Sequence, residues 1–393
     1  MQAEQAQIKL PFFTLLLMIS FAAANAVLYT PGLPAIANFF SVSINTAQQT
    51  VTWFLIGYTL GQLIYGPIAN RYGRKPALFV GISLQIISSL LCAFSGLLHQ
   101  YLLLIISIFL LALGSGVGLK MAFTLVNECY EPKVASQKIA YLMLAFAITP
   151  GLSLALGGIL TTHFGWMSCF YAGAIYGVIL LLLVTRLPET QMNLDFHALR
   201  IDNLIRGYRN QFRNIQLVSG GILMGGSTSF VYVFAAVAPF VAISLLGMNS
   251  QEYGIASLLP PVGLVFGSIC SARSAKKIPL QSLIRTGILV TSAGVALMII
   301  AVFMQLPALL SLFLPMLVIY FGLAFIIANA SAIAMSEIVD KAHGSAVMNF
   351  INMGIATIAV LTLGFFHTNT MTLPIIFIVF CIAMIVIYKW MQK

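Results

Sequence analysis

Charged residues are scarce in this sequence. Only 7% of its 393 residues are charged, whereas 60% are hydrophobic, and the mean hydropathy is +1.02. Soluble domains carry roughly 25% charged residues, so this composition excludes an ordinary soluble protein. A membrane-spanning helix needs about 20 mostly apolar residues. The long apolar runs therefore predict a polytopic membrane protein embedded in a lipid bilayer.

Side chains that bind metals or perform catalysis are also rare. The chain has five cysteines, five histidines, and nine Asp and Glu residues together. The cysteines fall in or beside apolar runs without paired spacing, so neither a disulfide framework nor a zinc site is implied. Metal transport would call for acids, His or Cys in the spans, and apart from Cys these are nearly absent there. We predict no metal and no cofactor.

Two other functional classes find little support. An enzyme needs a clustered acid, base or nucleophile, and the most suggestive pair is His197 with Asp202 in a charged inner segment. Chance explains that spacing well. A channel is expected to show a re-entrant pore loop or a repeated selectivity motif, and neither is visible. The sequence therefore favours a carrier over an enzyme or a channel.

The apolar runs form two sets of six, separated by the charged segment 187–214. We predict an all-α protein with twelve transmembrane helices in two pseudo-symmetric halves, residues 1–186 and 215–393, joined by this cytoplasmic linker. The first run is too long for a signal peptide and lacks an obvious cleavage site, so we expect it to be retained. The predicted spans are about 11–39, 47–69, 77–97, 101–127, 136–160, 165–186, 215–245, 253–272, 281–304, 307–335, 343–366 and 371–390.

Basic residues outnumber acidic ones, which gives a formal net charge of +10. They stand singly or in small groups at span ends, so no nucleic-acid-binding domain is predicted. With the N-terminus inside, every Lys and Arg except Lys120 falls on the cytoplasmic side, in agreement with the positive-inside rule. The sequence thus predicts a multi-pass protein of the cytoplasmic (inner) membrane with both termini in the cytoplasm.

Three cations and a tight turn lie between the second and third runs, in the stretch GPIANRYGRKP at residues 66–76. Cations do not enter hydrocarbon cheaply, so the stretch is a cytoplasmic hairpin. It resembles the loop signature of the major facilitator superfamily, G-x-x-x-D-R-x-G-R-[RK], except that Asn70 stands where the family usually has Asp. The alternative is an ordinary basic loop. We expect the loop to gate opening at the cytoplasmic face through Gly66, Asn70, Arg71, Gly73, Arg74 and Lys75.

The two halves echo each other. Gly263 and Gly267, followed by three cations, end the eighth run much as Gly66 and its cations end the second. The superfamily resemblance implies two six-helix halves around a central cavity near the membrane midplane. It also implies a monomer as the default state.

Within the superfamily the chain resembles the Bcr/CflA branch of drug:proton antiporters. Its departures are at Val27, where the branch usually has Asp, at Leu110 or Ala112 in place of Arg, and at Ser153-Leu154 in the fifth span. Proton coupling therefore does not simply carry over, and the coupling ion stays open. The matching stretches are Tyr29-Thr-Pro31-Gly-Leu-Pro34, Gly157-Gly158 with Trp166 and Phe170, Ala238-Pro-Phe240 with Gly247 and Tyr253-Gly254, and Gly344-Ser345-Ala346.

Lys120 is the one deeply placed charge. It precedes Asn127 by seven residues, which puts it about 10 Å from the inner end of its helix. Burying a lone ammonium costs about 3 kcal/mol on insertion scales, so such a residue usually faces a cavity. Thr124 and Asn127 share its helix face. The alternative is snorkelling of the side chain to the interface. We assign Glu128, which lies off this face, to the inner loop.

The remaining polar candidates are neutral. Asn25 and Tyr29 share a face of the first span, Thr228 and Tyr232 share one of the seventh, and Asn329 interrupts the tenth. The resemblance implies that these spans, with the fourth, line the cavity. We therefore predict contacts with a small-molecule substrate, while interhelical hydrogen bonds explain each residue equally well.

The expected function is secondary-active transport of a small organic solute by alternating access, with efflux of drugs or metabolites as the first hypothesis. The alternative follows from the charge of Lys120. A cavity with one potential cation and no acid should repel lipophilic cations and prefer anionic or polar neutral solutes. That hypothesis includes import or export of a carboxylate compound such as a citrate-type siderophore, with or without proton coupling.

Overall fold

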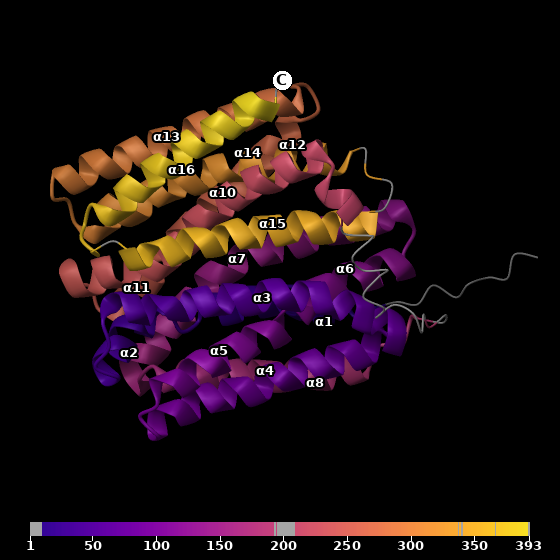
Figure 1. Cartoon of the computed structure of the whole chain (residues 1–393), viewed down its shortest axis with the longest axis horizontal. Helices are drawn as coiled ribbons and strands as arrows, with labels where there is room; N and C mark the ends of the chain where they lie inside the picture. Colours follow the sequence, from indigo (N-terminus) through magenta and orange to yellow (C-terminus); the bar gives the residue numbers. More distant parts are fainter. Residues whose placement is uncertain are drawn as a thin grey trace, which may run out of the picture.

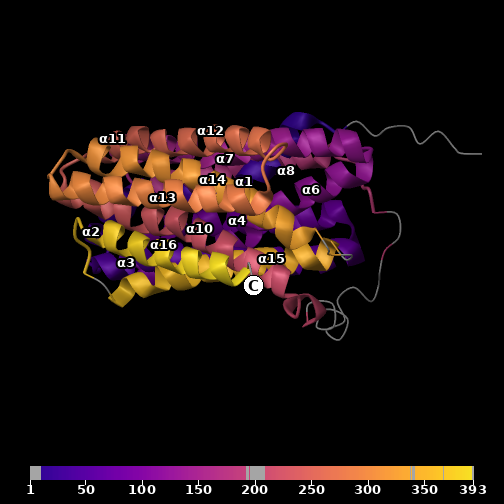
Figure 2. The same ribbon diagram turned by 90° about the horizontal axis from the view of Figure 1, so that it is seen from above.

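The computed structural model describes residues 10–191, 194, 209–336, 338, 341–365 and 367–391, and these residues form helices joined by short connections. The helices run roughly parallel to the long axis of the molecule (Figures 1 and 2). The first group comprises α1 (Phe12–Val27), η1 (Thr30–Gly32), α2 (Leu33–Phe39), α3 (Ile44–Tyr72), α4 (Arg74–Leu97), α5 (Tyr101–Ser115), α6 (Val117–Cys129), α7 (Pro132–Phe164) and α8 (Met167–Thr185). The second group comprises α10 (Ile215–Pro239), η2 (Phe240–Leu245), α11 (Ser250–Ala256), α12 (Leu259–Ser274), α13 (Leu280–Phe303), η3 (Leu309–Phe313), α14 (Leu314–Met335), α15 (Lys341–Thr362), η4 (Leu363–Phe365) and α16 (Thr372–Met391).

Eleven helical segments of the described chain are long and apolar enough to cross a membrane. The twelfth predicted span is α3, which is 29 residues long. Its apolar character is diluted by glutamines, including Gln48 and Gln62. The all-helical prediction is confirmed. Some helices extend beyond the predicted spans, as α7 does from Pro132 to Phe164, because the polar first and last turns of a helix carry no hydropathy signal.

The two groups repeat the same glycine contacts. In the first group Gly57 and Gly61 of α3 lie against the carbonyl groups of Phe109 and Leu113 in α5, so closely that a Cβ at either glycine would overlap the oxygen atom. Two helices can approach this closely only where the side chains are very small. The second group has the same arrangement, with Gly263 and Gly267 of α12 against the carbonyl groups of Leu317 and Phe321 in α14.

The molecule has two ends that differ in packing. We call the end where α8 ends and α10 begins the linker face, and the opposite end, with α2 and α11, the distal face (Figure 1). At the distal face three hydrogen bonds cross between the groups. They join Ser250 Oγ to the Pro31 carbonyl (3.2 Å), Asn45 Nδ2 to the Gly364 carbonyl (3.1 Å), and Gln48 Nε2 to Thr368 Oγ1 (3.3 Å).

Backbone contacts also close the distal face. Gly158 of α7 lies against the Ser250 carbonyl and Gly254 of α11, and Gly254 in turn lies against the Leu154 carbonyl. A large apolar core runs through this region and joins residues of both groups, such as Phe54 and Phe240. The two groups are therefore tightly packed at the distal end.

A second apolar core occupies the part of the first group near the linker face. Its buried members all lie between Leu10, just before α1, and Leu187, just after α8. Residues of the second group at the same level, such as Leu217 and Ala334, belong to the large core instead. The groups thus share one core at the distal end and have separate cores near the linker face.

Candidate functional site

The loop between α3 and α4 makes its turn at Gly73. This residue has φ 106° and ψ 161°, a conformation that is essentially restricted to glycine. The helix α4 then begins at Arg74, which is buried despite its charge. The turn allows the first N–H groups of α4 to face the end of α8.

Arg74 forms a salt bridge with Glu128 near the end of α6. Its Nη2 lies 2.7 Å from Glu128 Oε1, its Nε donates to the same oxygen at 3.1 Å, and its Nη1 donates to Asn70 Oδ1 at 2.7 Å. The Thr190 hydroxyl donates to the other Glu128 oxygen. The sequence assigns Glu128 only to the inner loop, and its salt bridge to Arg74 is a finding that helix-face arguments within α6 do not provide.

Glu189, four residues after the end of α8, caps the start of α4. Its carboxylate accepts the backbone N–H groups of Arg74 and Lys75, each at 2.9 Å, and those of Thr190 and Gln191, each at 3.0 Å. Partial burial tends to raise the pKa of this carboxyl group, but the four N–H donors outweigh burial and lower it. A carboxylate at a helix N-terminus also complements the helix dipole.

The other loop cations have local contacts. Lys75 Nζ donates to the Thr185 carbonyl at the end of α8 (2.6 Å), and the Arg71 guanidinium lies 5.3 Å from the centre of the Tyr72 ring. Together with Arg74 these contacts tie α3, α4, α6 and the residues after α8 into one polar cluster in the first group. The gating role of the loop stays a prediction.

Lys120 of α6 reaches across to α3. Its Nζ donates to the Gln62 carbonyl at 3.2 Å, and a Cβ at Gly66 would overlap the ammonium. Gly66 therefore leaves the space in which the partly buried ammonium sits. Thr124 and Asn127 share the helix face as expected, but both donate to their own helix, at the Lys120 and Phe123 carbonyls.

Two predicted substrate contacts lie in interhelical hydrogen bonds. Asn25 is buried and accepts from Gln85 Nε2 of α4 at 2.9 Å, while its own Nδ2 donates to the Phe21 carbonyl at 2.8 Å. Asn329 is also buried, and its Nδ2 donates to Ser271 Oγ of α12 at 2.9 Å. These partners satisfy the side chains by packing, as in the alternative interpretation, and the substrate role stays a prediction.

The predicted aromatic and hydroxyl contacts divide between two places. Tyr29 is buried and stacks on Phe170, with ring centres 5.4 Å apart. Thr228 and Tyr232 are partly exposed on α10. Tyr58 of α3 and Tyr320 of α14 lie near Tyr232.

Sequence reasoning did not select Tyr58 or Tyr320. Both are buried, they come from different groups, and both lie near Tyr232. A tyrosine that interrupts an apolar run was the available signal. In the part of the chain that the structure describes, no three His, Cys, Asp or Glu side chains gather into a cluster that could hold a metal ion.

Comparison with known proteins places these features in a family. Residues 15–360 match the profile of the Major Facilitator Superfamily. The chain belongs to this superfamily. Its membership confirms the predicted class of multi-pass membrane transporter and the prediction that the chain is not an enzyme.

Individual relatives are distant. The chain is 26% identical over 270 residues to an uncharacterized transporter of Rickettsia felis, a match that covers 68% of this chain and 65% of that protein. It is 26% identical over 362 residues to the multidrug transporter MdfA of Yersinia pestis, covering 88% and 84% of the two chains. The crystal structure of a D-xylose-proton symporter has the same fold, with a TM-score of 0.79, 15% identity and 96% coverage of both chains.

Proposed function

We propose that this chain is a secondary-active transporter of a small organic solute in the cytoplasmic membrane, and that it exports drugs or metabolites. The observation that carries the proposal is the packing difference between the two ends: one shared core at the distal face and separate cores near the linker face. This packing is that of a carrier closed at its distal face, and rocking of the two bodies would part the shared core as the separate cores approach each other, which alternates access. The resemblance to the Bcr/CflA branch and the similarity to a multidrug transporter support export.

The rest of the arrangement follows from the charge pattern. The linker face is assigned to the cytoplasm because the basic loop residues Arg71, Arg74 and Lys75 lie there. Residues 1–186 and 215–393 are the two moving halves, and residues 187–214 are the linker between them. The polar cluster around Arg74 holds the loop of the first half in shape while the halves move.

A flux measurement in proteoliposomes tests this proposal. We expect gradient-driven, saturable uptake or release of a neutral drug such as chloramphenicol, at rates of a carrier. Non-saturable flux at channel-like rates would contradict it. Solute flux measured in the same vesicles with and without an imposed pH gradient tests whether transport is coupled to protons. If protons drive transport, the titrating group is Lys120, the one charge deep in a described span, or an acid nearer the inner face such as Glu128. A flux that ignores the gradient would exclude proton coupling.

A second candidate is transport of an anionic carboxylate compound, including a citrate-type siderophore, in either direction. The observation that favours it is the Lys120 ammonium, which has three N–H donors and bonds to the Gln62 carbonyl. A ligand carboxylate would supply the acceptors and the negative charge that the span lacks, and a charged hydrogen bond is worth roughly 1–3 kcal/mol.

The variant Lys120→Gln separates the two candidates. Citrate binding should weaken about 5- to 150-fold in this variant and recover in Lys120→Arg, whereas a neutral ligand should be little changed. If ethidium, a lipophilic cation, proves the better substrate and Lys120→Gln leaves its transport intact, the anion hypothesis is wrong.

A further inference from the structure

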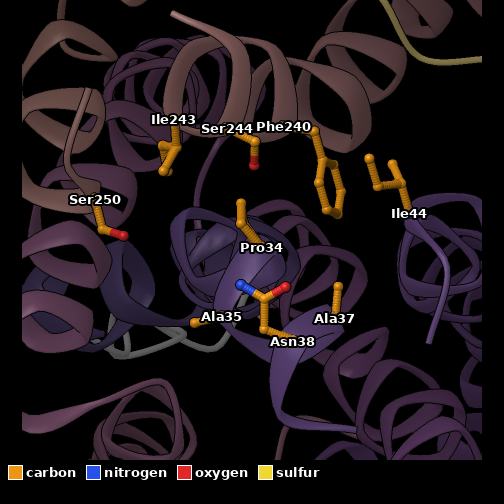
Figure 3. Close-up of a pocket in the computed structure, with 9 residues that line it drawn as sticks. All are labelled: Pro34, Ala35, Ala37, Asn38, Ile44, Phe240, Ile243, Ser244 and Ser250. Atoms are coloured by element: carbon orange, nitrogen blue, oxygen red, sulfur yellow. The ribbon is translucent and has the colours of Figure 1, made fainter. Parts of the chain in front are cut away.

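A pocket of roughly 570 Å³ opens at the distal face between the two groups (Figure 3). One wall is formed by α2 and the start of α3, with Pro34, Asn38 and Ile44. The other is formed by η2 and the start of α11, with Phe240, Ser244 and Ser250. None of the proposed substrate contacts lines this pocket.

The lining of the pocket is neutral. It contains no Asp, Glu, Lys, Arg or His side chain among the described residues. Figure 3 shows the amide of Asn38 and the hydroxyl of Ser244 directed into the space between α2 and η2, beside the apolar side chains of Pro34 and Phe240. An ion would lose hydration here without gaining a counter-charge, whereas an uncharged molecule could use both the polar and the apolar surfaces.

The pocket exists in its present shape only while the distal face is closed. Its two walls belong to different groups, and the hydrogen bond of 3.2 Å from Ser250 Oγ to the Pro31 carbonyl joins α11 to η1, the turn before α2. The close contact of Gly158 with the Ser250 carbonyl holds α7 against α11 beside it. If the groups rock apart at this face, both contacts break and the walls separate.

We propose that this distal pocket binds a small neutral amphiphile and that its occupant holds the distal face closed. A ligand that touches both walls binds the closed state better than the open one, and it shifts the population by that difference in affinity. Such a molecule inhibits transport instead of being carried. Binding and stabilisation stand without the proposed function, while the inhibition rests on it.

A tethered probe tests the proposal. Ser244→Cys is introduced where the exposed Cys270 and partly exposed Cys129 have been replaced by serine. The new thiol is then coupled either to neutral N-benzylmaleimide or to a cationic trimethylammonium-ethyl methanethiosulfonate. Thr162→Cys, at an exposed position on the distal end of α7 outside the pocket, is the matched control. Asn38→Cys on the opposite wall offers a second attachment point should Ser244→Cys fold poorly.

We expect the benzyl adduct of the Ser244→Cys protein to raise the Tm in detergent by about 2–4 °C and to lower flux at least fivefold. The cationic adduct, and either adduct of the Thr162→Cys protein, should leave the Tm unchanged. Equal shifts at both positions, or equal stabilisation by the cation, would overturn the pocket assignment. A raised Tm with undiminished flux would overturn the holding role. Absence of saturable flux in unlabelled protein would instead refute the proposed function.

Discussion

The two groups of helices have the same frame but a different charge pattern. The glycine contacts relate α5 to α14 by an offset of 208 residues, since Phe109 corresponds to Leu317 and Leu113 to Phe321. The first residues of α4 and α13, Arg74 and Leu280, relate these two helices by an offset of 206 residues. With these offsets Lys120 corresponds to Ala328 and Glu128 to Ser336. The repeat therefore keeps the contacts that pack helices together, whereas the charges at these three positions, Arg74, Lys120 and Glu128, occur in the first group alone.

This difference shows that the helices can pack in this arrangement without the three charged residues. The second group reaches the same helix arrangement with Leu280, Ala328 and Ser336 at the three charged positions. Buried charges are costly to place in an apolar interior, and a fold does not need them for stability. We infer that Arg74, Glu128 and Lys120 serve conformational change or recognition in the first group.

We expect the largest loss of stability when Arg74 is replaced by leucine, the residue at the corresponding position of the second group, Leu280. Arg74→Leu leaves Glu128 without its partner, and because that side chain is 28% exposed we expect a loss of roughly 2–3 kcal/mol, below the usual range for a fully buried pair. This loss is measured as the difference in unfolding free energy between the variant and the parent protein, in mixed micelles with an increasing fraction of dodecyl sulfate.

Glu128→Ser is the reciprocal change. The double variant should be more stable than the sum of the two single losses predicts, with a coupling energy of about 1–3 kcal/mol. Additive losses would show that the pair is not energetically linked. Undiminished transport by correctly inserted Arg74→Ala protein would remove the gating role of the loop.

The second prediction concerns stability at the turn between α3 and α4. Gly73→Ala forces alanine into a backbone conformation restricted to glycine and places its methyl group 2.6 Å from Glu189 Oε2, so we expect a loss of about 1–3 kcal/mol. Gly165→Ala is the control, because Gly165 has φ 78° with open space around its Cβ position. The Gly73 variant should lose more, and equal losses would argue against the Glu189 contact.

A third effect concerns the space beside Lys120. Gly66→Ala should displace the ammonium and cost roughly 1–2 kcal/mol of stability. In the background Lys120→Ala the same change should stabilise the helix by up to about 1 kcal/mol, since alanine has the higher helix propensity. A loss of the same size in both backgrounds would show that Gly66 does not accommodate Lys120.

The smallest effect is on pH dependence. Because the folded state lowers the pKa of Glu189, the stabilisation by its carboxylate is present above the unfolded pKa of about 4.3 and is lost as the pH falls through the folded pKa. Glu189→Gln should therefore be less stable than the parent protein at pH 7, with the gap closing in acid. A gap that does not change with pH would mean that the charge is unimportant.

The helices could be predicted from the sequence because hydropathy and length are local properties. The partners at the site could not. The pairing of Arg74 with Glu128 depends on the relative depth and rotation of α4 and α6, and the bond from Lys120 to a backbone carbonyl of α3 leaves no trace in side-chain composition. Likewise nothing in the sequence around Asn25 indicates that Gln85 of α4 donates a hydrogen bond to its side chain.

The distal pocket also could not be predicted from the sequence. Its walls come from α2 and η2, which are far apart along the chain, and their facing surfaces are set by how the two groups close against each other. Residues such as Asn38 and Ser244 carry no motif. Neutral side chains at helix ends are common on any membrane protein surface, so only the assembled structure selects them.

The central claim is that two rigid groups close at one face while they part at the other. Spin labels on Thr162 and Met304 report the distal face, and labels on Asn127 and Ser336 report the linker face, all at exposed positions in a chain whose native cysteines are replaced by serine. With a solute that the flux assay shows to be transported, the distal distance should lengthen in part of the population as the linker-face distance shortens. Distances that stay fixed at both faces during transport, or that change together in the same direction, would contradict the account.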